Sequence, residues 1–140
     1  MTTVQKIEDN FYSLKSGSYE AVICCFGATL VKLMLPDKDG KVEDCVLGFN
    51  TIPEYDRDRD QNPCFGSIIG RVANRVANAR FEIDGVKTEL DINCGDKHHL
   101  HGGAVGWHRR IWKPEEIQNG LRLTYSSPDG DDRYPGAVDA

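Results

Sequence analysis

Turn sequences recur about every ten residues along this 140-residue chain and divide it into short runs of alternating or apolar residues. No stretch keeps the apolar period that a long amphipathic helix requires. The runs occupy residues 10–15, 19–26, 29–35, 44–47, 80–83, 111–117 and 121–125. Short runs between glycine-bearing turns are typical of strands. We therefore predict an all-β fold, an antiparallel β-sandwich with one short helix.

Local signals mark two turns and the helix. The dipeptides at 84–85 and 119–120 are Asp-Gly and Asn-Gly, whose residues tolerate the positive φ angles of a tight hairpin. The helix is expected after Thr51, which has capping-box spacing to Glu54, with Pro53 at an early helical position. The charged run that follows, YDRDRDQN, is expected to be a solvated loop.

The composition is that of an ordinary globular chain, with 39% hydrophobic and 28% charged residues, and the length suits a single domain over residues 1–140. A net charge of -5 disfavours nucleic acid and anionic membranes as partners. No apolar run is long enough to span a membrane, and the N-terminus lacks the apolar segment of a secretory signal. The five cysteines lack metal-site or disulfide spacing, so we expect free thiols in a reducing cytoplasm.

Three histidines and two glycines fall in the hexapeptide HHLHGG, at residues 98–103. If this segment is extended, His99 and His101 lie on one face and could begin a metal site, with His108 or an aspartate as a further ligand. No second cluster has ligand spacing, so a metal site is the least favoured interpretation. A histidine that hydrogen-bonds a ligand or transfers a proton beside a glycine turn is one interpretation of His101. A buried structural histidine is an equally good one.

The segment GRVANRVANARF, at 70–81, is rich in asparagine and arginine. In a helix, Asn74 and Asn78 would share a face, as would Arg71 and Arg75, but an irregular loop is equally compatible. Amide and guanidinium groups together offer the donors and acceptors that suit sugar hydroxyls. The alternative is that the arginines make loose surface salt bridges with the acidic loops.

Five stretches resemble the aldose 1-epimerase, or galactose mutarotase, family, in its order and at its spacing. They are VLGFNTIPEY at 46–55, FGSIIGRVANRVANARFEIDG at 65–85, INCGDKHHLHGG at 92–103, GWHRRIW at 106–112 and SPDGDDRYPG at 127–136. The resemblance covers nearly all of this chain but only the N-terminal portion, somewhat under half, of a typical member. It implies a large antiparallel supersandwich with an open sugar groove, of which residues 1–140 form a single truncated domain.

The resemblance also implies an activity, the interconversion of the α and β anomers of a free aldose such as galactose or glucose. A general base takes the proton of the C1 hydroxyl while a general acid protonates the ring oxygen, and no cofactor is needed. Asn74 and Arg75 match the family's sugar-contacting pair. His101 matches the histidine of its L-H-G-G motif, which lines the site near the ring oxygen and C1. His98 and His99 are then loop neighbours.

The chain also departs from the family's pattern. The family's catalytic histidine, its glutamate base and a sugar-binding aspartate belong to later motifs that would lie beyond Ala140, so no catalytic residue is assigned here. Trp107 and His108 stand where Phe and Asp are commoner, and Arg133 stands where an acidic residue or glycine is commoner. We therefore expect this polypeptide alone to be a weak or inactive mutarotase.

Two other functions stay open on the sequence alone. A non-catalytic carbohydrate-binding or regulatory module would keep the pocket wall and lack the proton chemistry, whereas a metal-binding interaction domain would use the histidine cluster. A sandwich cut in mid-sheet exposes strand edges. We therefore expect a truncated product that self-associates or pairs with a separately made C-terminal half, with a small-molecule aldose as its ligand.

Overall fold

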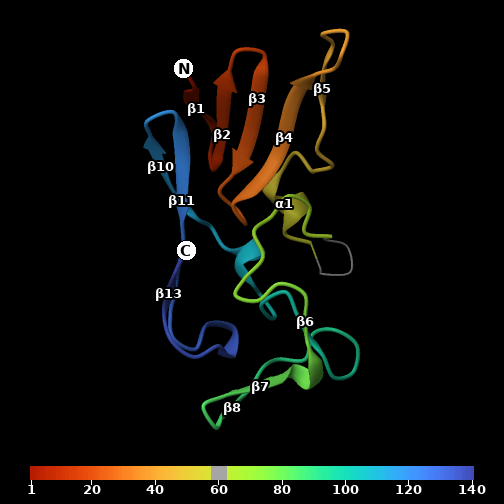
Figure 1. The fold of residues 1–140 in the computed structure, drawn as a ribbon, viewed down its shortest axis with the longest axis vertical. Coiled ribbons are helices and arrows are strands. Elements are labelled where there is room, and N and C mark those ends of the chain that lie inside the picture. Colours follow the sequence, from red (N-terminus) through yellow and green to blue (C-terminus); the bar gives the residue numbers. More distant parts are fainter. Residues whose placement is uncertain (58–62) are drawn as a thin grey trace.

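The computed structural model of the chain describes residues 1–57 and 63–140. Every strand pair in these ranges is antiparallel. The largest sheet has the order β1-β2-β3-β4-β5, so strands that are adjacent in the sequence are also adjacent in the sheet. Its strands are β1 (Thr3–Glu8), β2 (Phe11–Ser16), β3 (Tyr19–Cys24), β4 (Thr29–Pro36) and β5 (Val42–Asp44). Figure 1 shows this sheet at one end of the molecule.

The remaining strands form four two-stranded sheets. They are β6 (Arg75–Val76) with β9 (His99–Leu100), β7 (Arg80–Ile83) with β8 (Val86–Glu89), β10 (Lys113–Ile117) with β11 (Gly120–Thr124), and β12 (Ser126–Ser127) with β13 (Val138–Asp139). Short 3₁₀ helices lie at Ala77–Ala79, Trp107–Arg109 and Asp131–Arg133. In Figure 1 the β10–β11 hairpin stands beside the large sheet, and β7–β8 lies at the opposite end of the molecule.

The all-β prediction is confirmed, and six of the seven predicted strands form within two residues of their expected bounds. The seventh, at 44–47, is wrong, because β5 ends at Asp44. The carboxylate of that residue accepts hydrogen bonds from the backbone N–H groups of Leu33 and Val46, so these two groups bond a side chain instead of a partner strand. The patterns also miss β1, most of whose residues are exposed and which therefore lacks an apolar signature.

The two hairpin signals differ in outcome. The Asp-Gly turn is confirmed, with φ angles of 52° at Asp84 and 80° at Gly85 in the loop between β7 and β8. At the second signal Asn119 adopts the expected left-handed conformation, with a φ of 61°. Gly120, however, already belongs to β11, so the turn lies one residue earlier than the Asn-Gly pair indicates.

The predicted helix forms as α1 (Ile52–Tyr55). The carboxylate of Glu54 accepts the backbone N–H of Thr51 over 3.1 Å, which is the contact that the capping-box spacing indicates. Tyr55 is only 1% exposed and packs in the main core, so the expectation of a solvated loop is wrong for its first residue. Residues 58–62 of that charged run lie outside the described residues.

Two clusters of buried side chains hold the fold together. The larger covers one face of the large sheet and consists of Phe11, Val22, Cys24, Phe26, Val31 and Tyr55. The smaller, beside β7, consists of Ala79, Leu90 and Tyr134. All five cysteines are free thiols, and Cys24 and Cys25 are completely buried, where they act as small apolar side chains. No helix within the described ranges is long and apolar enough to cross a membrane.

Candidate functional site

The segment at 70–81 is irregular rather than helical. Asn74 and Asn78 have left-handed backbone angles, with φ of 65° and 56°, and such residues interrupt a helix. Between them the chain forms the short strand β6, and a 3₁₀ turn follows. The helical interpretation, with shared asparagine and arginine faces, is therefore wrong, and the irregular-loop alternative describes this segment.

The β6–β9 pair brings the three predicted site residues together. Arg75 pairs with Leu100, which places Asn74 beside His101. The backbone N–H of Asn74 donates to Nδ1 of His101 over 2.9 Å, and the backbone N–H of His101 donates to the carbonyl oxygen of Asn74 over 3.1 Å. These two bonds continue the ladder by one position and use the imidazole ring in place of a backbone acceptor.

Hydrogen bonds join the three residues of the Asn–Arg–His cluster (Asn74, Arg75 and His101). Nη1 of Arg75 donates to Oδ1 of Asn74 over 3.1 Å. Asn74 and Arg75 are exposed, and His101 is half-buried. The cluster therefore gathers guanidinium and amide N–H donors, an amide oxygen and an imidazole ring. That mixture of donors and acceptors suits a ligand with several hydroxyl groups.

Hydrogen bonds assign the proton on two of the rings in or near this cluster. Nδ1 of His101 accepts a backbone N–H, so the proton of its neutral ring lies on Nε2. His98 is held in the same way, because its Nδ1 accepts the backbone N–H of Asn78 over 3.2 Å. Each neutral ring therefore carries its hydrogen-bond donor on Nε2, the nitrogen farther from the backbone.

His99 has a structural role instead. It is completely buried, and its Nδ1 lies 2.8 Å from the carbonyl oxygen of Asp91, which can only accept, so Nδ1 carries the proton. Nε2 then accepts the hydroxyl of Tyr134 over 2.8 Å. Burial raises the pKa of Tyr134 to about 12, so its hydroxyl remains a donor at neutral pH.

The expectation that His99 and His101 share a face is wrong. His101 has a φ of 53°, and this left-handed conformation ends the alternation of β9 after Leu100. Among residues 1–57 and 63–140, no group of three or more His, Cys, Asp or Glu side chains is arranged to hold a metal ion.

Arg71 serves a segment far along the chain. Its five N–H contacts, over 2.5–3.1 Å, go to the hydroxyl and carbonyl oxygens of Ser127 and to the carbonyl oxygens of Pro128, Pro135 and Gly136. Sequence reasoning paired Arg71 with Arg75 and missed this role. No spacing rule could have found it, because the partners lie at least 56 residues away.

The loop that Arg71 binds has its own internal network around Asp131. Its carboxylate accepts the hydroxyls of Tyr125 (2.9 Å) and Ser127 (2.7 Å) and pairs with the guanidinium of Arg110 (2.6 Å). Burial by itself raises the pKa of Asp131, but the two hydroxyl bonds and the charge of Arg110 outweigh it, so the pKa lies below its ordinary value. Asp131 is therefore ionised at neutral pH.

The departures from the family's pattern have local explanations. The ring of Trp107 packs on Gly70, where an added Cβ would lie 2.0 Å from it. His108 is buried. Arg133 has a φ of 67° and pairs with Asp91 over 2.6 Å. None of these three side chains belongs to the Asn–Arg–His cluster.

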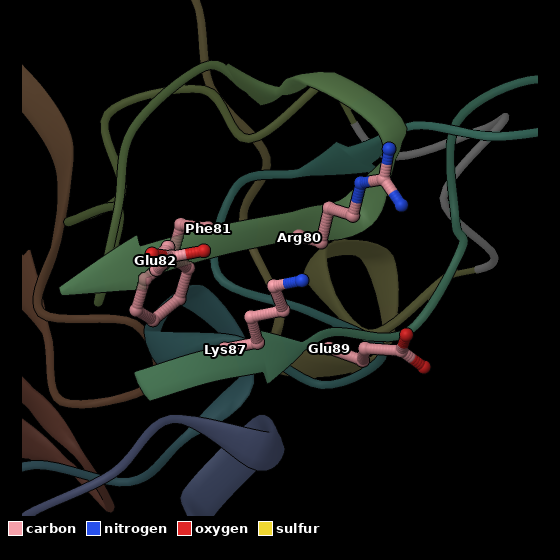
Figure 2. A pocket seen from close by; sticks show the side chains of 5 residues that line it. All are labelled: Arg80, Phe81, Glu82, Lys87 and Glu89. Atoms are coloured by element: carbon pink, nitrogen blue, oxygen red, sulfur yellow. The ribbon is translucent and has the colours of Figure 1, made fainter. Parts of the chain in front are cut away.

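A cavity of about 380 Å³ lies elsewhere, on the β7–β8 hairpin. Figure 2 shows its lining, which consists of Arg80, Phe81, Glu82, Lys87 and Glu89. Each basic residue stands opposite an acidic one in the strand register, so the charges balance across the hairpin. We assign the candidate site to the Asn–Arg–His cluster, since the hairpin cavity has the features of a solvated charged face.

Residues 10–140 match the family model described as aldose 1-epimerase. The galactose mutarotase of Rattus norvegicus is 38% identical over 127 residues, which are 91% of this chain and 36% of that protein. The aldose 1-epimerase of Escherichia coli is 38% identical over 117 residues, 82% of this chain and 32% of that protein.

Solved structures agree with these matches. An aldose epimerase homologue from C. elegans has a TM-score of 0.80 at 34% identity, over 99% of this chain and 40% of that one. The galactose 1-epimerase of Lactobacillus acidophilus has a TM-score of 0.74 at 27% identity, over 99% of this chain and 42% of that one. The fold is thus an antiparallel β-sandwich of the galactose mutarotase type. The chain belongs to the aldose 1-epimerase family. It spans 36% of the length of the galactose mutarotases that it matches.

Proposed function

We propose that this chain contributes the sugar-binding wall of an aldose 1-epimerase, a mutarotase that interconverts the α and β anomers of a free hexose such as galactose or glucose. The hydrogen bond from the N–H of Asn74 to Nδ1 of His101 supports this most directly. It makes Nε2 of that ring a donor beside the bonded Asn74–Arg75 pair. In the proposed complex, Asn74 and Arg75 bind sugar hydroxyls, and His101 donates to the ring oxygen.

The chemistry of this reaction explains why such a donor matters. The C1 hydroxyl loses its proton to a general base, the bond between C1 and the ring oxygen breaks, and the ring oxygen gains a proton. The resulting aldehyde rotates about C1–C2, and the freed hydroxyl attacks its other face to give the other anomer. Negative charge develops on the ring oxygen as the bond breaks, so a donor at His101 stabilises the transition state more than the bound sugar.

The 140-residue polypeptide by itself should accelerate mutarotation only slightly. Within the Asn–Arg–His cluster, His101 is the one residue of a type that serves as a general acid or base, and each further general acid or base is worth about 10²–10⁴-fold. Polarimetry of freshly dissolved α-galactose should therefore give a rate within about tenfold of the buffer rate. A rate comparable with that of a full-length galactose mutarotase assayed alongside would contradict this expectation.

Sugar binding is the second arm of the same experiment. Galactose added to ¹⁵N-labelled polypeptide should shift the imidazole signal of His101, and His101→Ala should weaken binding about tenfold because a donor is lost. Arg80→Ala, in the hairpin cavity, is the matched control and should leave binding unchanged. The alternative function, a non-catalytic carbohydrate-binding or regulatory module, predicts galactose binding with no acceleration even after the rest of a full-length relative is supplied.

We further propose that a second copy of this chain, or a segment equivalent to the rest of a full-length relative, covers its apolar surface. A hollow of about 430 Å³ between the large sheet and the β10–β11 hairpin is lined mainly by apolar side chains, among them Leu14, Ile23, Trp107, Trp112, Leu121 and Leu123. Covering such surface is favourable by about 25 cal/mol per Å². Size exclusion with light scattering should give a mass above 15.6 kDa that rises with concentration. A monomer at every concentration, with a cooperative melt, would argue against this.

A further inference from the structure

The loop at 127–136 contacts both segments that carry the Asn–Arg–His cluster. Its carbonyl groups bind the guanidinium of Arg71, at the start of the segment that leads into β6. The hydroxyl of Tyr134 bonds His99 in β9. The carboxylate of Asp132 bonds the turn that follows β9. One loop therefore fixes the two sides of the site relative to each other.

Asp132 is the member of this loop whose side chain bonds the turn that follows His101. Its Oδ1 accepts the backbone N–H of Val105 and its Oδ2 accepts that of Gly106, each over 3.1 Å. Gly103 packs against the same side chain, since an added Cβ there would lie 2.6 Å from the Cβ of Asp132. The side chain is only 7% exposed, and each oxygen bonds one N–H group of the turn, while Oδ2 also lies 3.7 Å from Nη2 of Arg110.

The turn transmits this restraint to the imidazole ring. It runs from His101 to Gly106, and its two ends are packed together, because an added Cβ on Gly106 would lie 2.8 Å from the carbonyl oxygen of His101. We propose that Asp132 is a positioning residue of the sugar site. Its carboxylate holds the far end of the turn and so keeps His101 in the left-handed conformation that directs its ring to the N–H of Asn74. This role presupposes the sugar site proposed above, although Asp132 itself bonds the turn rather than the cluster.

The neighbouring carboxylate provides a matched control. Asp131 lies in the same loop and is similarly buried, with 9% of its side chain exposed. Its side-chain bonds go to Tyr125, Ser127 and Arg110, all outside the turn at 101–106. Loss of either carboxylate removes buried hydrogen bonds from one loop, but only loss of Asp132 releases the turn.

The experiment compares Asp132→Asn with Asp131→Asn in the full chain, by imidazole ¹⁵N spectra and by galactose titration. An asparagine offers one acceptor oxygen where two N–H groups need acceptors, so the turn loses a bond at position 132. In sugar-free Asp132→Asn, the His101 signal should move from the Nε2–H form towards a mixture of tautomers, and galactose affinity should fall about tenfold. Asp131→Asn should lower the melting temperature by a similar amount and leave both readouts as in the unsubstituted chain.

Two results would overturn the role of Asp132: an equal loss of galactose affinity in both variants, or a His101 spectrum that Asp132→Asn leaves unchanged. If Asp132→Asn does not fold, the test is hydrogen exchange at the amides of Val105 and Gly106 in the unsubstituted chain. Exchange as fast as in an open loop would overturn the role of Asp132. An unsubstituted chain that does not respond to galactose would refute the sugar site. The sugar-free His101 spectrum would still test Asp132.

Discussion

Gly102→Ala should destabilise the chain by about 4 kcal/mol or more and abolish galactose binding at the same time. A Cβ at this position would lie 1.5 Å from the carbonyl oxygen of Gly70 and 2.7 Å from the backbone nitrogen of Arg71. Both neighbours are backbone atoms, so no side-chain rotation relieves the collision, and the segment that leads into β6 must move. Urea denaturation, monitored by tryptophan fluorescence, measures the change in the free energy of unfolding.

Gly40→Ala is the control for this substitution. Gly40 has a φ of +83°, against +84° at Gly102, and an added Cβ there would meet nothing within 4 Å. The control should therefore show only the backbone strain, about 1 kcal/mol. If the two variants unfold at the same urea concentration, the close approach of the turn to Gly70 does not exist in solution, and the positioning of His101 must have another origin.

Arg71→Ala should destabilise the chain by about 2–4 kcal/mol, because one guanidinium satisfies acceptors on both arms of the 127–136 loop. Arg71→Lys should recover only part of this, since a single ammonium group lacks the planar fork that reaches both arms. The free energy of unfolding is measured as for Gly102. Hydrogen exchange should also show that the 127–136 loop opens more often in Arg71→Ala.

Arg122→Ala is the comparison for Arg71. Arg122 in β11 also has a bonded partner, since its Nη1 lies 3.0 Å from Oε2 of Glu115, but more than half of its side chain is exposed. An exposed pair of this kind contributes about 0–1 kcal/mol. Equal, small effects at Arg71 and Arg122 would show that the loop is held by other contacts and would also weaken the case for a positioning role in that loop.

Local chemistry made much of the fold predictable from the sequence. Strands β2, β3, β4 and β7 follow from alternation, because the side chains of a strand point to opposite faces whatever lies beyond it. Asp84 and Asn119 indicate turns, because few residue types tolerate positive φ angles. Strand β1 and the end of β5 escape prediction, because their residues are mostly exposed and pairing with neighbours defines them.

The candidate site was predictable to a different extent. The resemblance to the aldose 1-epimerase family singled out Asn74, Arg75 and His101, and the structure brings these three residues together through β6 and β9. Their roles in sugar binding remain a proposal for the titration to test. The motifs give no indication of the roles of Arg71 and Asp132, because the bonds of these side chains join residues that lie 26 to 65 positions apart.

The sequence by itself therefore determined the all-β class, the positions of most strands, the short helix and the family. Only the tertiary structure decided which histidines are buried, which ring nitrogen carries the proton at His101, and which loop bonds Arg71 and the turn after β9. The physical reason is the separation along the sequence over which each effect acts. Propensity and alternation act between residues a few positions apart, whereas a tautomer or a buried hydrogen bond depends on partners that only the packed chain brings together.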